Sequence, residues 1–184
     1  MAPGRVRLAA PGEHVRYVVR RCSLGALLVA WTDRGACDVR FGLDDVETIE
    51  GIRRRFPAAR LELAVVPTWV ETLVDAVDRP RDIRIPCDIE GTAFQERVWR
   101  ELERIPMGET RSYSDIAKAI GKPQAARAVA RACAQNRVAV AIPCHRVVHA
   151  DGGVSGYRWG PERKKELLRR EHECKDPRRP SRTP

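Results

Sequence analysis

The spacing of apolar residues changes near Asp88, and this change constrains the fold more than any other feature of the chain. Before it, apolar residues concentrate in short runs at 15–21, 24–32 and 36–41, with the turn signals Ser-Leu-Gly and Asp-Arg-Gly between them. These runs predict an antiparallel meander. After Asp88, apolar residues recur at helical spacing. We therefore expect an α+β fold, with a small N-terminal α/β domain and a mainly helical C-terminal domain.

The rest of the N-terminal part adds helices around the expected sheet. Apolar residues at helical spacing predict one helix from Val46 to Phe56, ended by Pro57, and a second over 68–77. Residues 83–86 have the pattern of a short edge strand. Nothing in residues 1–88 gathers chemical groups at a recognisable spacing, so we interpret this part as a scaffold.

The C-terminal domain is expected over 89–174, and its first helix has a clear start. Thr92 followed by Gln95 has the spacing of a capping box. The helix is expected to end at Pro106-Met107-Gly108, and its apolar stripe is Phe94, Val98, Leu102 and Ile105.

Two shorter helices follow, separated by a glycine turn. Ser112 or Ser114 starts the first, and Gly121 stops it. Pro123 sits at a first-turn position and opens the second helix over 124–135. Helix, tight turn, helix is the layout of a helix-turn-helix DNA-binding unit, although many helical hairpins share it.

The second of these helices carries six alanines together with Arg127 and Arg131. Small side chains let a helix approach the floor of a groove closely, and arginines reach phosphates or bases. The alternative is a helix packed tightly against another, with alanines chosen for fit.

A thiol and an imidazole, Cys144 and His145, stand side by side after the apolar run 138–142 and Pro143. The run predicts a buried strand or strand-like segment, which the proline ends at the cysteine. A cysteine at that point can be partly exposed while its neighbours stay dry, a setting in which a thiol becomes a nucleophile. The alternative is a buried structural cysteine beside a surface histidine.

A glycine-rich loop at 151–160 follows, and it can fold closely around a ligand, with Tyr157 and Trp159 as stacking or packing surfaces. Pro161 begins a last helix whose Leu167 and Leu168 face the core. Glu171 lies near its end, where a carboxylate can orient an imidazole. The alternative for this glutamate is a surface ion pair.

Charge and cysteine content narrow the classes of partner and compartment. The net charge is +9, carried by 34 Lys and Arg residues, which suits a polyanionic partner or reflects an arginine-rich proteome. The six cysteines have no zinc-site spacing, and no apolar signal core or membrane-length run is present. We expect reduced thiols and an intracellular, cytoplasmic protein. The basic segment 175–184 is expected to be a disordered tail.

At this point the motifs resemble those of a known family. The sequence Pro-Cys-His-Arg-Val at 143–147, the alanine-rich helix before it, Ser-Gly-Tyr-Arg-Trp-Gly at 155–160 and the final helix ending in Glu171 resemble the O6-alkylguanine-DNA alkyltransferases. The resemblance covers residues 91–171 and is closest to bacterial members, including the C-terminal half of the adaptive-response protein Ada. The first 88 residues are similar to the family's small N-terminal domain. The chain has no room for the zinc-bearing and transcription-factor part of Ada, so we expect repair without a transcriptional switch.

The resemblance implies a role for each of five residues. Cys144 would accept the alkyl group, and His145 would remove its proton through a water molecule. Glu171 would orient the imidazole, and Asn136 would brace the segment between the recognition helix and the cysteine. Tyr113 would contact the extruded base and protonate the guanine as it leaves.

The resemblance also implies how DNA and the base are held. Arg127 would enter the duplex and fill the space left by the flipped nucleotide. The DNA-contacting residues would be Arg127, Tyr113, Ala126, Arg131 and Arg146. The base pocket would be formed by Val147, Tyr157, Arg158 and Cys133; Cys133 is either a packing residue or a second reactive thiol. Arg158 stands where some members place a serine that donates to the guanine oxygen, so a backbone N–H is an alternative donor.

The implied activity is repair of O6-alkylguanine in double-stranded DNA by irreversible transfer of the alkyl group to Cys144. No metal or other cofactor and no obligate protein partner is expected, and the protein is expected to be a monomer consumed in one turnover. A non-catalytic lesion-binding protein that flags damage is the alternative, but such relatives lack the acceptor cysteine. A cysteine hydrolase is a third reading. Whether larger groups or O4-alkylthymine are substrates stays open.

Overall fold

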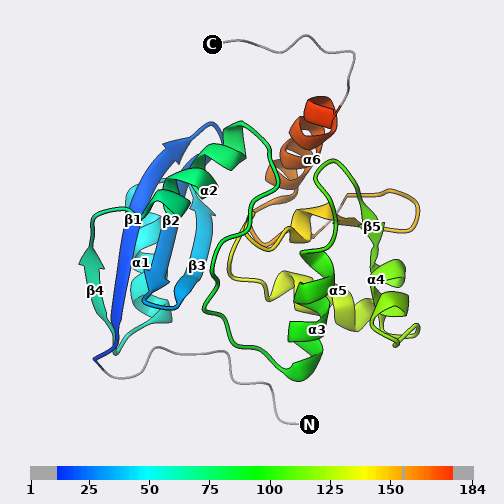
Figure 1. Cartoon of the computed structure of the whole chain (residues 1–184), viewed down its shortest axis with the longest axis horizontal. Helices are drawn as coiled ribbons and strands as arrows, with labels where there is room; N and C mark the ends of the chain where they lie inside the picture. The colour runs from blue at the N-terminus through cyan, green and yellow to red at the C-terminus, as the bar shows by residue number, and fades with distance from the viewer. Residues whose placement is uncertain (1–11, 155, 176–184) are drawn as a thin grey trace.

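The computed structural model describes residues 12–154 and 156–175. The N-terminal half is a sheet with helices on both faces, and the C-terminal half is mainly helical (Figure 1). The predicted α+β class and the antiparallel meander are confirmed. The segment expected to be a disordered tail lies outside the described residues, except for Lys175, which ends the last helix.

The sheet has the strand order β3-β2-β1-β4. Its meander consists of β1 (His14–Cys22), β2 (Gly25–Thr32) and β3 (Gly35–Gly42), joined at the two turns that the sequence indicates. A fourth strand that we did not predict, β4 (Arg60–Leu63), pairs in parallel with β1. The sheet is therefore mixed rather than purely antiparallel.

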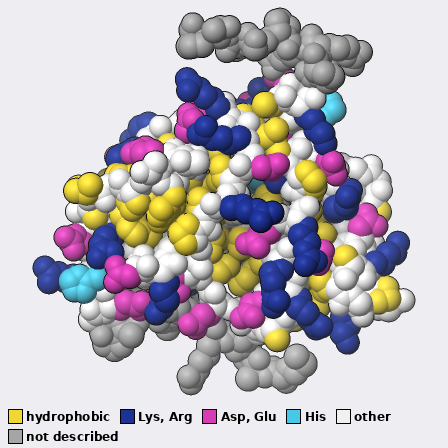
Figure 2. All heavy atoms as spheres, viewed as in Figure 1, with side chains coloured by type: hydrophobic (Ala, Val, Ile, Leu, Met, Phe, Trp, Pro, Cys, Tyr) yellow, Lys and Arg dark blue, Asp and Glu magenta, His cyan; other side chains and the backbone are white. Residues whose placement is uncertain are grey.

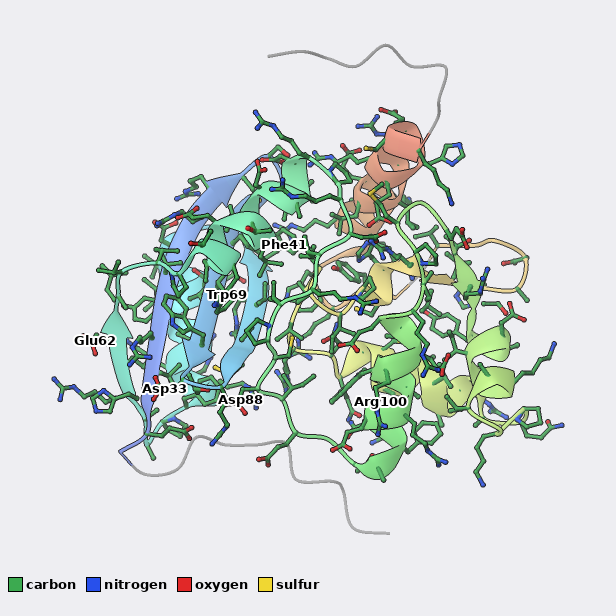
Figure 3. The ribbon with its side chains drawn as sticks, in the orientation of Figure 1. Asp33, Phe41, Glu62, Trp69, Asp88 and Arg100 are labelled. Atoms are coloured by element: carbon green, nitrogen blue, oxygen red, sulfur yellow. The ribbon has the colours of Figure 1, made fainter. Side chains whose placement is uncertain are left out.

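Two helices cover the sheet, and both were predicted: α1 (Asp45–Arg55) and α2 (Thr68–Asp78). The central strand β2 is buried on both sides, and successive residues of it belong to different apolar clusters. Leu28 packs in the cluster that contains Ile52 of α1, and Val29 packs in the one that contains Leu73 of α2. Trp69, labelled on α2 in Figure 3, meets Trp31 edge-on, with ring centroids 6.1 Å apart.

The segment between α2 and α3 runs along the sheet without forming the edge strand predicted at 83–86. A single bridge joins Cys87 to Ala36, where the Ala36 N–H donates to Pro86 O and the Asp88 N–H donates to Ala36 O, each at 2.8 Å. Pro86 has no N–H to donate, and the rest of the β3 edge is occupied by another segment, so pairing stops there. Figure 3 shows Asp88 beside the end of β2, where its carboxylate accepts from Thr32 at 2.5 Å.

In the described residues, the C-terminal half is built from the helices α3 (Ala93–Leu102), α4 (Tyr113–Ala119), α5 (Ala126–Ala134) and α6 (Pro161–Lys175). The capping box at Thr92 is present, and Ser112 is the residue that caps α4. Pro123 does not open α5 as predicted. The Ala125 N–H donates to Lys122 O at 2.8 Å, and this turn delays the start of the helix to Ala126.

The two halves share one apolar core. The larger buried cluster contains Val29 and Leu73 of the sheet half together with Trp99, Val129 and Leu167 of the helical half. On the face in Figure 2, hydrophobic side chains gather over the sheet half, while basic and acidic side chains mix over the helical half. In the described part of the chain, every helix is too short or too polar to cross a membrane.

Candidate active site

The segment before the Cys-His pair is mostly buried, but it forms a turn with one bridge to the sheet rather than a regular strand. Only Val138 bridges to the sheet edge: the Val39 N–H donates to Arg137 O at 2.8 Å, and the Ala139 N–H donates to Val39 O at 3.0 Å. The chain then turns back, with Ala141 N–H bonded to Ala139 O and with Val140 at φ 67°. A continuous apolar run has no periodicity that separates a strand from a buried turn.

Asn136 holds this turn through its side chain. Its Oδ1 accepts from the Val138 N–H at 3.0 Å, and its Nδ2 donates to Ile142 O at 2.9 Å. The same Nδ2 lies 3.1 Å from Cys144 Sγ as a donor. Asn136 is fully buried, so these bonds replace the strand pairing that the segment lacks.

Cys144 begins a short 3₁₀ helix, η1 (Cys144–Arg146), and the residue is 4% exposed. The prediction of a partly exposed cysteine at the end of regular structure is therefore wrong. Burial raises the pKa of the thiol to about 11, although the Asn136 hydrogen bond and the positive charges of Lys164 and Arg158 act in the opposite direction. The resting sulfur is a neutral thiol that needs a base to react.

His145 is that base candidate, and Glu171 fixes its orientation. His145 Nε2 lies 2.9 Å from Glu171 Oε1, and both side chains are almost completely buried. Burial lowers the pKa of His145, while the carboxylate opposes this. A neutral ring that donates through Nε2 leaves Nδ1 as the acceptor, and this buried Nδ1 has no hydrogen-bond partner among the described residues. The lone pair is therefore available for a proton.

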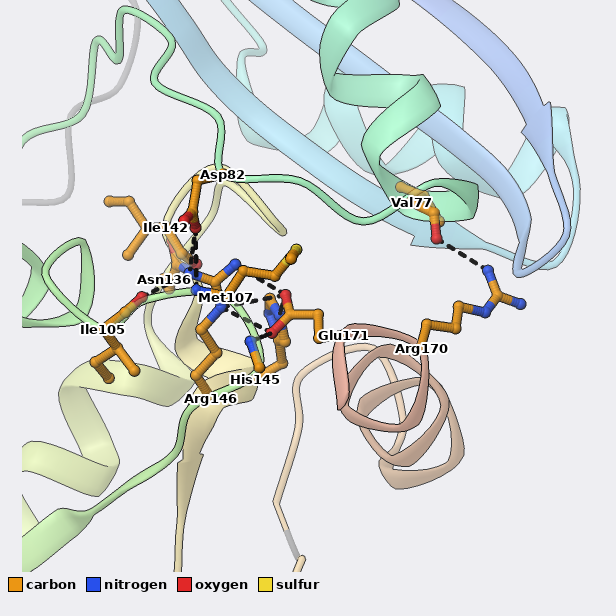
Figure 4. A network of polar contacts seen from close by, with 11 residues as sticks. Val77, Asp82, Ile105, Met107, Asn136, Ile142, His145, Arg146, Arg170 and Glu171 are labelled. Carbon is orange, nitrogen blue, oxygen red and sulfur yellow. Dashed lines mark hydrogen bonds and ion pairs between the residues drawn. The ribbon is translucent and has the colours of Figure 1, made fainter. Parts of the chain in front are cut away.

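Arg146 lies inside the protein and completes this network (Figure 4). Its guanidinium donates to both oxygens of Glu171 at 2.9–3.1 Å and to Ile105 O at 2.6 Å, and it is 3.4 Å from Asp82. Burial raises the pKa of Glu171, but the hydrogen bonds and charges of His145 and Arg146 outweigh it and hold the pKa at about 2. The Arg146 guanidinium is therefore engaged inside the protein, and the structure gives it a structural role rather than the DNA contact that we expected.

Tyr113 is brought to the site by a second, two-stranded sheet. In it, β5 (Arg111–Ser112) pairs in parallel with β6 (Val147–Val148), which directly follows η1. Tyr113 is the first residue after β5, and its ring meets His149 edge-on at 5.4 Å. Burial raises the pKa of Tyr113 to about 12, so its hydroxyl stays protonated.

Lys164 is a site residue that sequence reasoning missed. It is 1% exposed, its Nζ lies 5.9 Å from the centre of the Tyr113 ring, and its charge acts on both Cys144 and Cys133. Burial lowers the pKa of Lys164. A lysine in an Arg-Lys-Lys-Glu run looks like a surface residue. The usable signal was its position, three residues before the buried Leu167 and seven before Glu171 on the same helix face.

The residues predicted to form the base pocket lie around the same region. Val147 is fully buried, and Tyr157 is 9% exposed with a hydroxyl that has no hydrogen-bond partner among the described residues. Tyr157 packs on Trp159 at 5.0 Å. Cys133 is buried and its pKa is raised by burial, which favours packing over a second reactive thiol. Arg158 is exposed and donates to Ala134 O at 3.3 Å.

The helix pair α4 and α5 leaves one face of α5 open. Val129, Ala132 and Cys133 face the core, and Trp99 of α3 donates to Ala132 O at 3.0 Å. Arg127 and Arg131, one helical turn apart, are both exposed. The described residues contain no group of three His, Cys, Asp or Glu side chains that could hold a metal ion.

Comparisons with known proteins agree with this arrangement. Residues 93–173 match the family described as 6-O-methylguanine DNA methyltransferase, DNA binding domain. The chain is 49% identical over 162 residues to the bifunctional transcriptional activator/DNA repair enzyme Ada of Escherichia coli, which covers 86% of this chain and 46% of Ada. It is 42% identical to the inducible methylated-DNA–protein-cysteine methyltransferase of Bacillus subtilis, covering 66% of this chain and 70% of that protein.

Solved structures resemble the whole fold. The crystal structure of Mycobacterium tuberculosis OGT in complex with DNA has a TM-score of 0.72 and 32% identity, and the match covers 88% of this chain and 94% of that one. The chain spans about half the length of the first curated relatives it matches. The matches to the Bacillus protein and to the Mycobacterium tuberculosis structure extend over most of the length of those two proteins. The chain belongs to the 6-O-methylguanine DNA methyltransferase family.

Proposed function

We propose that the protein repairs O6-alkylguanine in double-stranded DNA by moving the alkyl group to its own Cys144. The observation that carries this proposal is a pair of buried contacts at neighbouring residues: Asn136 Nδ2 to the Cys144 thiol at 3.1 Å, and His145 Nε2 to Glu171 at 2.9 Å. The family's name and the DNA-bound structure of the Mycobacterium tuberculosis relative support it.

The reaction uses a neutral thiol and a neutral imidazole. His145 takes the proton of Cys144 at Nδ1, directly or through a water molecule, and Glu171 stabilises the imidazolium. The sulfur then attacks the alkyl carbon, an S–C bond forms, and the C–O6 bond breaks. The electron pair goes to the guanine, which takes a proton; the protonated Tyr113 hydroxyl is the proposed donor. The thioether product is stable, so each molecule reacts once.

Burial of Cys144 requires that the base come to the protein. An alkylated guanine stacked in a duplex cannot reach a cysteine that is 4% exposed, so the nucleotide has to be turned out of the helix. We propose that α4 and α5 form a helix-turn-helix unit on the DNA and that Arg127 fills the vacated space. Arg131 and Ala126 lie on the same helix, and the backbone near Val147 with Tyr157 and Arg158 holds the base. No further protein is needed for this, and we propose that it acts as a monomer.

The need for a reduced thiol at Cys144 indicates the cellular compartment in which the protein works. Transfer requires Cys144 as a reduced thiol, and all six cysteines are free in the structure. Thiols persist in reducing surroundings, so we propose that the protein works in the cytoplasm.

Mass spectrometry tests the proposal. The protein is mixed with a duplex that carries one O6-methylguanine, alongside Cys144→Ala and Cys174→Ala. Cys174 is exposed, so it controls for thiol reactivity that depends on exposure alone. We expect one methyl group per molecule, on the Cys144 peptide, in the wild type and in Cys174→Ala but not in Cys144→Ala. Binding of the damaged duplex without any gain in mass would favour the lesion-binding alternative.

A further inference from the structure

A charged hollow lies where the sheet half meets the glycine-rich loop, and of its charged residues only Arg158 has been used so far for alkyl transfer. Its volume is about 380 Å³. It is bordered by the end of β3, by one face of α1, by the residue after Asn136 and by the 158–159 segment of the glycine-rich loop. Its charged lining consists of Arg40, Arg54, Arg137 and Arg158 with the carboxylates of Asp38 and Glu47.

Both carboxylates in the hollow are already engaged. Asp38 is 1% exposed and accepts two hydrogen bonds from Arg40, at 2.7 and 2.5 Å. Its Oδ2 is also 3.5 Å from Arg55, whose side chain is only 10% exposed. Glu47 accepts from the Leu43 N–H at 2.7 Å at the start of α1. The arginines therefore outnumber the negative groups that face them.

Arg40 pairs with Asp38 and Arg54 with Glu50, whereas the exposed Arg158 has no counterion among the described residues. Arg137 has no counterion there either, and it is the more buried of the two. Its Nε is buried and has no hydrogen-bond partner among the described residues, and no carboxylate of that part of the chain lies within ion-pair distance. Burial and the charge of Arg137 lower the pKa values of Arg55 and Arg158. A buried donor without an acceptor is costly, and it marks a place where an anion can bind.

The hollow adjoins the proposed DNA-binding helix. Arg137 follows α5 within three residues, and Arg158 donates to Ala134 O at the C-terminal end of that helix. The charge of Arg158 also acts on Cys144. An anion held here would therefore lie beside the active site and at the opposite end of α5 from Arg127.

We propose that this hollow binds a phosphate group between the two halves of the chain, and that the backbone of the bound DNA supplies it. Arginine presents a planar fork of donors that matches phosphate, and four such side chains converge here. The inference rests on the proposed function for its partner. It assigns a DNA contact to Arg40 and Arg54 of the N-terminal half, which we interpreted from the sequence as a scaffold only.

The salt dependence of binding to an undamaged duplex tests the assignment. For a double helix, the slope of log K against log salt falls by about 0.9 for each phosphate contact that is lost. We expect Arg137→Gln and Arg54→Gln each to reduce the magnitude of this slope by up to that amount. Arg79→Gln, which changes an arginine that is 79% exposed at the far end of α2, should leave the slope unchanged. Three slopes equal to that of the wild type would overturn the proposal.

Two further measurements keep the outcomes distinct. Arg54 is 70% exposed, so Arg54→Gln tests the site even if circular dichroism shows that Arg137→Gln is misfolded. Inorganic phosphate is exchanged for chloride at fixed ionic strength, and Tm is measured for the wild type and Arg137→Gln. Protection of the wild type alone, with unchanged DNA slopes, would show a site for free phosphate and overturn the DNA assignment. Because binding is scored without a lesion, reduced slopes would support the site even if alkyl transfer were absent.

Discussion

The sheet half and the active-site half of this protein are held in shape by different kinds of interaction. Backbone pairing fixes β1, β2 and β3, whose register is continuous over most of their length. The segment 136–146 has a single bridge to the sheet and depends instead on the side chains of Asn136 and Glu171. The first kind of order tolerates most side-chain changes, whereas the second is lost when one side chain is shortened.

This difference places structural and chemical sensitivity in separate parts of the molecule. A defect in the sheet half should lower stability but leave the rate of the folded molecules unchanged. A defect at Asn136 or Glu171 should lower both, because these buried side chains hold the segment 136–146 in place and also contact the Cys144 thiol or the His145 ring. Substitutions in the two halves can therefore be compared by their effects on stability and on the transfer rate.

Glu171→Gln should have the largest effect. It removes the carboxylate that pairs with the buried Arg146 guanidinium and with His145. Breaking a buried ion pair costs about 3–5 kcal/mol, and loss of the group that orients a base lowers the rate by on the order of 10²-fold or more. Urea unfolding and single-turnover transfer measure the two effects. Glu173→Gln, two residues away on a more exposed face, is the control, and equal behaviour of the two variants would contradict the network.

Gly35→Ala should damage the sheet half alone. Gly35 has φ +136°, and an added Cβ would lie 2.4 Å from Pro86 O. The segment between α2 and α3 would therefore have to move. We expect a loss of about 2–3 kcal/mol in the free energy of unfolding. The transfer rate per folded molecule should stay within twofold of the wild type. A tenfold slower rate at full folding would show that the two halves are not separable.

Asn136→Ala should combine a smaller loss of stability with a clear loss of rate. It leaves the Val138 N–H and the Ile142 carbonyl without their partner inside the protein. The expected destabilisation is about 1–3 kcal/mol. Displacement of Cys144 relative to His145 should slow transfer by on the order of 10-fold to 10²-fold. A variant that is as stable as the wild type and transfers the alkyl group equally fast would show that Asn136 neither holds the turn nor positions Cys144.

Lys164→Met should have the smallest effect. The positive charge of Lys164 favours the thiolate of Cys144, so its removal should raise the pKa of that thiol further. We expect several-fold slower alkylation of Cys144 by iodoacetamide and little change in stability, because methionine keeps the packing of the stem. Faster alkylation would mean that Lys164 opposes the reaction. Lys165→Met, at the exposed neighbouring position, is the matched control.

Much of the fold was predictable because its signals are local. The capping box at Thr92 and the turns around Gly25 and Gly35 depend on neighbouring residues only. The parallel strand β4 could not be found in this way, because a mostly exposed four-residue strand lacks an apolar face. Pairing with β1 across more than forty residues left no periodic pattern in the sequence.

The site was predictable in its residue types but not in its geometry. Cys144, His145 and Glu171 follow from the motif, yet the apolar run before them is compatible with a strand, and only the structure shows Val140 in the left-handed region. Arg146 and Arg127 are the same residue type in a basic chain. Nothing local distinguishes the arginine that pairs with a buried carboxylate from the one that lies on the surface.

The most direct test of whether His145 activates Cys144 is the single-turnover transfer rate as a function of pH. The pKa of Cys144 is raised to about 11 and that of His145 is lowered, so the neutral thiol and neutral imidazole coexist over the whole range between them. If His145 is the base, the rate should fall only at acid pH, with a midpoint below 6.5, and should be flat from there through pH 9. A rate that instead rises about tenfold per pH unit through this range would mean that the reaction depends on thiolate formed by solvent, and that His145 does not activate Cys144.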